Sequence, residues 1–225
     1  MRTLHVLSLA LSAALLSACG AHPTAAVAKF DQAAAVRAAG DAKLEKPVVA
    51  STVLAYGHAV ARTLDPKASF MSLTGTQIAA DGTPTTGGHW EIQYVGSTVA
   101  APAGAKPNPY SPWIRRITVT VSPEGKTKLK ETAQSGLPLG VSYMDAPMPG
   151  LDSDRALDLF FKLRGDEAKR QPLHQVALAG MAGPHHFDRL VWRLTPIANS
   201  TDGATVLDAT SGEVIQQVGA SVAKP

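Results

Sequence analysis

Cys19 is the only cysteine in this chain of 225 residues, so thiol chemistry can occur at one position only. It ends the run Leu16-Ser17-Ala18-Cys19, which closes an apolar stretch near the N-terminus. Without a second thiol, the chain can form neither an internal disulfide nor a cysteine-based zinc site.

His185, His186 and Asp188 are the first candidates for metal ligands. Neutral imidazoles with a carboxylate suit zinc or copper, and His174 could join them from another strand. Adjacent histidines on an extended strand point to opposite faces, however, and the Gly-Pro pair before them indicates an exposed loop. We therefore expect solvated histidines rather than a metal site, and we predict no cofactor.

Sequence motifs that mark a catalytic centre do not occur in this chain. There is no Gly-x-Ser-x-Gly, Walker or G-x-G-x-x-G pattern. His58 has no second histidine four residues later, which a zinc-peptidase helix would require. Asp152 and Asp154 stand at a predicted helix start, where carboxylates complement the helix dipole. We predict that the chain is not an enzyme and has no catalytic residues.

The first 18 residues have the three-part layout of a secretory signal peptide. Arg2 gives a short positive region, residues 4–16 are apolar, and small residues precede Cys19. The four residues that end at Cys19 resemble the lipobox of bacterial lipoproteins. This resemblance implies cleavage between Ala18 and Cys19, a diacylglyceryl thioether on Cys19 and an acylated amino group. The alternative is an ordinary signal peptide that is cut nearby, for example after Ala21.

A lipid on Cys19 implies that the protein is held to a membrane of a bacterial cell envelope. By the sorting pattern of enterobacterial lipoproteins, Gly20 in place of an aspartate favours the outer membrane over the inner membrane. The N-terminal apolar run is too short to span a bilayer, which takes about 20 residues. From Cys19 onward, 207 residues carry 20 basic and 18 acidic side chains, a balance that gives no support for nucleic-acid binding.

The rest of the chain predicts an α+β fold with two tandem units, each consisting of one helix packed on an antiparallel sheet. The predicted segments are a flexible tether (19–46), a first unit (47–132), a linker (133–150) and a second unit (151–219). In both units a helix precedes a strand, a tryptophan-bearing strand and a hairpin. Trp90 and Trp192 occupy matching positions in this order.

Apolar residues at helical spacing predict the first helix, which begins at Pro47 and ends at Asp65-Pro66. They are Val49, Val53, Tyr56, Val60 and Leu64. Asp152 or Ser153 is expected to cap the second helix, which Gly165 ends. Apolar and polar alternation and turn residues predict strands at 70–79, 90–95, 117–121, 126–131, 173–178, 190–194, 204–208 and 213–217.

Lys126, Lys128 and Lys130 alternate along one predicted strand, with Arg115 and Arg116 close in the sequence. We expect these residues to form a basic strip on the solvent face. Such a strip protects an edge strand from aggregation. The alternative is contact with anionic lipid or cell-wall polymer near the anchor.

The last predicted hairpin carries a second resemblance. Trp192-Arg193-Leu194 is followed by Thr205-Val206-Leu207-Asp208-Ala209-Thr210-Ser211-Gly212-Glu213-Val214. This resembles the PepSY pattern, whose final hairpin reads V-x-D-A-x-T-G-x-V. The resemblance implies PepSY-like or cystatin-like units, and a link to inhibition or chaperoning of secreted peptidases. Asp208 is expected to accept N–H bonds within the turn, and Val206 and Val214 to point onto the helix.

Together these observations predict a non-enzymatic envelope lipoprotein that acts as a binding or accessory module. Its expected partners are the membrane, through the lipid on Cys19, and an envelope protein or peptide. Addition of a partner's strand to a free sheet edge is one plausible mode of binding. Two alternatives stay open: an inhibitor or chaperone of a secreted peptidase, and a structural component of the envelope.

Overall fold

A computed structural model describes residues 43–105, 110–137, 143–165, 170–181, 189–196 and 203–217. All of these residues belong to one compact unit within residues 32–225. The predicted signal peptide (1–18), Cys19 and the predicted tether up to residue 42 lie outside the described residues.

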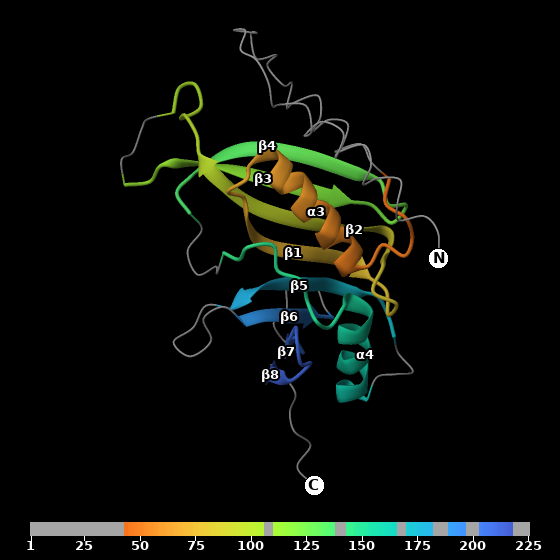
Figure 1. Ribbon diagram of the computed structural model, residues 1–225. Coiled ribbons are helices and arrows are strands. Elements are labelled where there is room, and N and C mark those ends of the chain that lie inside the picture. Colours follow the sequence, from red (N-terminus) through yellow and green to blue (C-terminus); the bar gives the residue numbers. More distant parts are fainter. Residues whose placement is uncertain are drawn as a thin grey trace, which may run out of the picture. The chain divides into compact units, whose positions relative to one another are not determined.

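The described part of the chain is built on one antiparallel sheet of eight strands, with two helices (Figure 1). In space the strands follow the order β4-β3-β2-β1-β5-β6-β7-β8. The strands are β1 (Ser69–Ile78), β2 (Pro84–Thr98), β3 (Trp113–Val121), β4 (Thr127–Ser135), β5 (Leu173–Met181), β6 (Arg189–Thr195), β7 (Thr205–Asp208) and β8 (Val214–Gln217). The helices are α3 (Ala50–Leu64) and α4 (Ser153–Arg164).

The prediction of two tandem helix-on-sheet units is wrong, because the strands form one continuous sheet. β1 and β5 pair antiparallel, with Ser72 opposite Ala179 and Ile78 opposite Leu173. One cluster of buried residues also includes side chains from both halves of the chain. In two separate units, β1 and β5 would each expose unpaired backbone groups at a sheet edge, and their pairing satisfies those groups. The fold is therefore dominated by its one large sheet. The predicted boundaries of the tether, the linker and the two units are not tested by this finding and stay a prediction.

The two helices form where the sequence patterns indicate them. α3 buries an apolar stripe that includes Val53, Val60 and Leu64, and it ends just before Asp65-Pro66. α4 begins after its N-cap Asp152, whose carboxylate accepts the N–H of Ser153. Gly165 ends α4 in the left-handed conformation with φ of 67°, a geometry that glycine adopts without a steric penalty.

Trp90 and Trp192 make the same contact at the start of a helix. The indole N–H of Trp90 donates to the carbonyl oxygen of Val48 at 2.9 Å, and that of Trp192 to the carbonyl oxygen of Leu151 at 2.8 Å. Each acceptor stands two residues before the first residue of its helix. Both tryptophans are fully buried. The matching of the two tryptophans is therefore confirmed within the single sheet.

Residues 143–150, called here the crossover segment, connect the two halves and pack on the first. Met144 forms an antiparallel bridge with Phe70 at the beginning of β1, with N···O distances of 2.7 and 3.0 Å. Asp145 pairs with Arg62 of α3 at 2.5 Å, and both side chains are largely exposed. The crossover segment is thus bonded to β1 and to α3.

The two faces of the sheet differ in character. The core face packs against α3 and α4, whereas the opposite face carries partly exposed polar residues such as Ser72, Thr74 and Thr118. In the last hairpin Leu207 is the residue that enters the core, because it stands opposite the buried Trp192, whereas Val206 stands opposite the exposed Arg193. The expectation that Val206 and Val214 both point onto the helix is therefore wrong.

Candidate functional site

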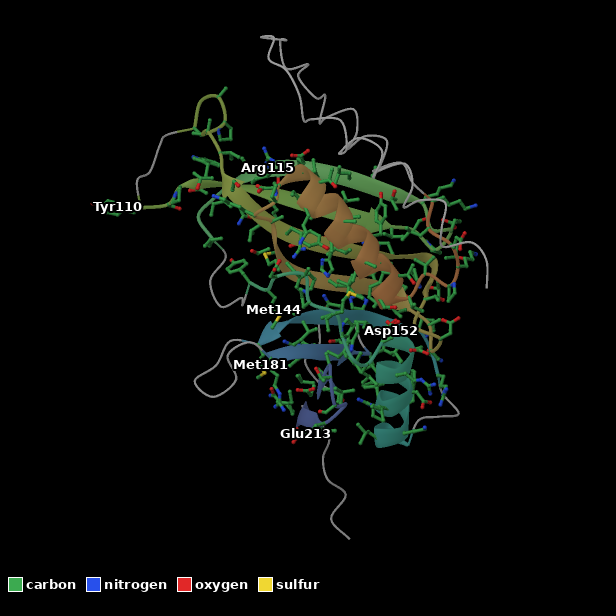
Figure 2. All side chains as sticks on the ribbon, in the orientation of Figure 1. Tyr110, Arg115, Met144, Asp152, Met181 and Glu213 are labelled. Carbon is green, nitrogen blue, oxygen red and sulfur yellow. The ribbon has the colours of Figure 1, made fainter. Side chains whose placement is uncertain are left out.

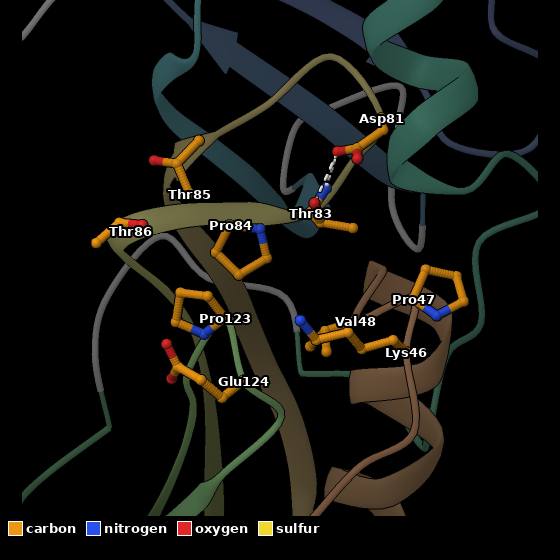
Figure 3. A pocket seen from close by; sticks show the side chains of 10 residues that line it. All are labelled: Lys46, Pro47, Val48, Asp81, Thr83, Pro84, Thr85, Thr86, Pro123 and Glu124. Atoms are coloured by element: carbon orange, nitrogen blue, oxygen red, sulfur yellow. Dashed lines mark hydrogen bonds between the residues drawn. The ribbon is translucent and has the colours of Figure 1, made fainter.

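A cleft of about 740 Å³ opens at one end of the sheet (Figure 3). Three segments form its walls: the lead-in to α3, the β1–β2 turn with the start of β2, and the β3–β4 turn. The lining residues are Lys46, Pro47, Val48, Asp81, Thr83, Pro84, Thr85, Thr86, Pro123 and Glu124. Three proline rings and one valine give an apolar wall, while one ammonium, two carboxylates and three hydroxyls supply polar groups.

Asp81 is positioned by the turn that it begins. Its Oδ1 accepts the backbone N–H of Thr83 at 3.0 Å and the Thr83 hydroxyl at 2.7 Å (Figure 3). This side-chain-to-backbone bond two residues later is the usual device by which aspartate stabilises a turn. The geometry fixes the carboxylate at the rim of the cleft, and the side chain stays exposed.

Glu124 occupies the opposite wall, in the β3–β4 turn. Its Oε2 accepts the Ser122 hydroxyl at 2.7 Å. That hydrogen bond lowers the pKa of Glu124, and the charges of Lys126 and Lys46 lower it further. Glu124 therefore stays ionised at neutral pH and faces the same cleft as the Lys46 ammonium.

Ser153 ties the wall at the β1–β2 turn to both helices. Its hydroxyl donates to the carbonyl oxygen of Gly82 at 3.1 Å, and it accepts the N–H of Ala50 at 3.1 Å. Gly82 has φ of 78°, and a Cβ at this position would lie 2.5 Å from the backbone nitrogen of Asp154. Glycine is required here both by the backbone conformation and by the close approach of α4.

Asp152 lies where the N-terminal ends of the two helices meet (Figure 2). Its Oδ1 accepts the N–H of Ser51 in α3 at 3.1 Å and the N–H of Ser153 in α4 at 2.7 Å. Its Oδ2 accepts the hydroxyl of Ser51. One carboxylate thus caps two helices, and both helix dipoles favour its negative charge. This arrangement fixes the start of α3, which follows the cleft wall at 46–48.

His58 and Tyr94 form a buried pair between α3 and β2. The Tyr94 hydroxyl and His58 Nδ1 are 2.8 Å apart, and His58 Nε2 lies 2.9 Å from the carbonyl oxygen of Pro147. A carbonyl only accepts, so Nε2 carries the hydrogen, and Nδ1 then accepts from Tyr94. Burial lowers the pKa of His58 below its ordinary value of 6.5, and burial raises the pKa of Tyr94 well above its usual range. The pair holds the crossover segment against α3.

One hydroxyl and one imidazole are in hydrogen-bond contact on the polar face of the sheet. Thr76 Oγ1 and His89 Nδ1 lie 3.1 Å apart on the polar face of the sheet, as a cross-strand pair. No contact recorded for this pair adds a carboxylate partner that would orient the imidazole. Among the residues that the structure describes, no group of three or more His, Cys, Asp or Glu side chains is placed to hold a metal ion. In the same part of the chain, no helix has the length and hydropathy needed to cross a membrane.

The residues predicted to carry chemistry are mostly outside the described chain. This holds for Ala18 and Cys19 at the predicted cleavage and lipidation site, and for His185, His186 and Asp188. His174 lies within β5 and is partly exposed. The structure therefore does not test the lipidation site or the metal candidates.

Asp208 is a structural residue, as the turn pattern indicates. Its Oδ1 accepts the N–H groups of Thr210 at 2.8 Å and Ser211 at 2.7 Å, and Oδ2 pairs with Arg189 at 2.5 Å. The Ser211 hydrogen bond contributes most to lowering the pKa of Asp208, although burial opposes the shift. The predicted role of this carboxylate in the turn is confirmed.

The predicted basic strip is divided between the two faces of the sheet. Lys128 and Lys130 are exposed on the face away from α3, together with Arg116. Arg115 points to the helix side, where its guanidinium donates to the carbonyl oxygen of Leu64 at 2.9 Å. Arg115 therefore stabilises the C-terminal end of α3 and does not belong to the strip.

Comparisons with known proteins found little that bears on the function of this chain. No protein-family model matches the chain, and no curated protein matches it. A solved structure from Clostridium difficile 630, described as that of a candidate lipoprotein, is similar over 67% of this chain and 82% of its own. The identity is 8% and the TM-score 0.37. A similarity of this size carries no argument about the fold or the activity of the present chain.

Proposed function

We propose that this chain is a bacterial envelope lipoprotein, anchored through lipid on Cys19, whose folded part acts as a non-enzymatic binding or accessory module. The observation that carries the proposal is the run Leu16-Ser17-Ala18-Cys19 at the end of an export signal. By the sorting pattern of enterobacterial lipoproteins, the outer membrane is favoured over the inner membrane, because glycine rather than aspartate follows the cysteine.

The cleft in Figure 3 is the proposed binding site of this module. Asp81 and Glu124 each have one carboxylate oxygen in a recorded hydrogen bond, and the second oxygen of each can accept a bond from a ligand. The rings of Pro47, Pro84 and Pro123 add apolar surface. Such a site suits a peptide segment that combines a basic side chain with apolar neighbours.

Cys19→Ala is expected to abolish incorporation of labelled fatty acid into the protein, because the thioether forms on this sulfur. The measurement is metabolic labelling of cells that produce the wild type or the variant, followed by immunoprecipitation. His174→Ala is a control that leaves the export signal intact and should be labelled like the wild type. Label that persists in the Cys19→Ala protein would contradict the assignment of the anchor.

A photo-reactive amino acid in place of Thr86 is expected to give a covalent adduct in intact cells with the lipid anchor retained. Thr86 is exposed at the rim of the cleft, so the reactive group would reach a bound segment. The matched control carries the same group in place of Arg155, which is exposed on α4. Adducts should be several-fold more abundant at Thr86, and Glu124→Lys should reduce them. Equal yields at both positions would exclude the cleft as the binding site.

A second candidate function, inhibition or chaperoning of a secreted peptidase, rests on the PepSY resemblance of the last hairpin. The specific observation in its favour is the turn at Asp208, whose carboxylate accepts two backbone N–H groups. Mass spectrometry of the adducts from Thr86 distinguishes the two candidates. A peptidase would favour the second function, whereas another envelope protein would favour an accessory role.

A further inference from the structure

Four lysines share one surface close to residue 43, the first residue that the structure describes. Lys128 and Lys130 lie in β4, Lys126 stands directly before this strand at the same alternating spacing, and all three are exposed. Leu129 packs against the core cluster, and Thr127 contacts Tyr56 of α3. Because strand residues alternate between faces, the three lysines project from the face away from α3.

Lys43 adds a fourth charge to this surface. It forms an antiparallel bridge with Lys126, and the N–H of Leu44 donates to the carbonyl oxygen of Gly125 at 2.8 Å. Residues directly opposite in an antiparallel pair point to the same face, so the two ammonium groups lie on one side. Like charges in this position are destabilising unless an anion compensates them.

No carboxylate of the described residues forms an ion pair with these lysines, although the charge of Lys126 acts on Glu124 in the β3–β4 turn. Within the part of the chain that the structure describes, none of the four lysines has a carboxylate oxygen within 4.0 Å, the limit for an ion pair. The cross-strand neighbours of Lys128 and Lys130 on β3 are Thr120 and Thr118. Glu131 lies on the helix side, where it pairs with Arg115. Within the described structure, the four ammonium groups therefore have no direct ion-pair partner.

We propose that Lys43, Lys126, Lys128 and Lys130 form a docking surface for the anionic phospholipid headgroups of the membrane that holds the anchor. The inference rests on the proposed function, because the anchor determines which surface the lysines meet. Lys43 follows Cys19 by 24 residues, and a chain of that length spans at most about 80 Å even when fully extended. The diacylglyceryl and N-acyl chains on Cys19 suffice for stable attachment, and the basic surface would add contact between the lysines and the headgroups.

The choice of a bilayer follows from the shape and chemistry of this surface. The lysines are exposed along an edge strand of the sheet, where several ammonium groups can meet a broad anionic surface at once. Flexible ammonium groups act as point charges and suit a fluid layer of phosphodiesters.

The test uses the chain from residue 19 onward with Cys19→Ala, so that no lipid contributes to binding. We expect sedimentation with vesicles of phosphatidylcholine and phosphatidylglycerol in equal parts, and none with phosphatidylcholine alone. Each basic residue contributes about fivefold at a charged surface, so Lys126→Gln, Lys128→Gln and Lys130→Gln together should weaken binding on the order of a hundredfold. Added salt should weaken binding of the parent chain as well.

A matched triple variant separates this surface from net charge. Lys67→Gln, Arg155→Gln and Lys162→Gln remove three exposed positive charges elsewhere, and this protein should bind like the parent within about twofold. An equal loss in both triple variants would overturn the proposal, as would binding to phosphatidylcholine alone. Binding to soluble polyphosphate without binding to vesicles would also overturn it. Since these proteins have no lipid, their failure leaves the fatty-acid labelling result for Cys19 untouched.

Discussion

Asp152→Ala is expected to lower the free energy of unfolding by about 3 kcal/mol. The substitution removes four hydrogen bonds to a partly buried carboxylate, two from Ser51 and two from Ser153. It leaves the first turns of both helices without their cap. Urea unfolding of the chain from residue 19 with Cys19→Ala, followed by tryptophan fluorescence, measures the effect.

Two variants distinguish the loss of the shared cap from the loss of one negative charge at a helix start. Asp152→Asn keeps an oxygen that can accept both backbone N–H groups, so it should cost about 1 kcal/mol. Asp154→Ala removes a carboxylate from the first turn of α4 alone, and it should cost less than about 1 kcal/mol. If Asp154→Ala and Asp152→Ala destabilise equally, the shared cap at Asp152 has no special role.

A double-mutant cycle with Ser51→Ala tests the connection between the two helices directly. Ser51 and Asp152 are 101 residues apart in the chain, yet they are hydrogen-bonded through two pairs of atoms. Partners in contact show coupling energies of about 0.5–3 kcal/mol, whereas independent sites add. A coupling energy near zero would mean that the two helix ends are stabilised separately. The same contact holds the start of α3, so Asp152→Ala should also reduce adducts from Thr86 in the cleft.

Local patterns in the sequence predicted the elements but not their arrangement into one sheet. The stripe in α3, the cap at Asp152 and the alternation around Trp90 each depend on neighbours within a few residues. The β1–β5 pairing joins residues about a hundred positions apart, and periodicity does not specify a strand's partner. One sequence feature did carry relevant information. β1 contains no charged residue and lies inside the sheet, whereas the lysine-bearing β4 is an edge strand.

The candidate site was missed because its parts come together only in three dimensions. The cleft is lined by three turns and loops that are separated in the sequence, and their polar residues match no motif. For the Tyr94–His58 pair, two features of the sequence do indicate a buried contact, although neither identifies the partner. Tyr94 stands on the apolar face of its strand with Trp90 and Ile92, and a buried tyrosine needs a partner for its hydroxyl. His58 follows Leu54 by one helical turn, on the buried side of α3.

The folded part of the molecule is expected to lose stability as the pH falls below about 6.5, and His58 should account for much of this loss. Burial lowers the folded-state pKa of His58, with Arg62 contributing, while the Pro147 carbonyl and Asp145 oppose the shift. The unfolded chain therefore binds a proton at higher pH than the folded chain does. Stability is complete above the ordinary pKa of 6.5 and decreases below it, by at most about 1.4 kcal/mol per pH unit.

His58→Gln should flatten this dependence between about pH 6.5 and about pH 5, although it lowers stability at neutral pH by about 2 kcal/mol. His174→Gln is the matched control and should keep the slope of the parent. Asp65 and Asp208 do not interfere, since their pKa values lie below 3.8 and their contributions are lost only in stronger acid.

Hydrogen exchange at the amide of Met144, which donates to Phe70, tests whether the crossover segment is the part that opens. Protonated His58 carries hydrogens on both nitrogens, so Nδ1 can no longer accept from Tyr94, whose hydroxyl has no other recorded partner in the described structure. Protection of Met144 should therefore fall at low pH before that of Leu178, which lies in the core of β5. Equal loss of protection at both amides would show that acid unfolds the sheet as a whole, and that the pair does not control the crossover segment.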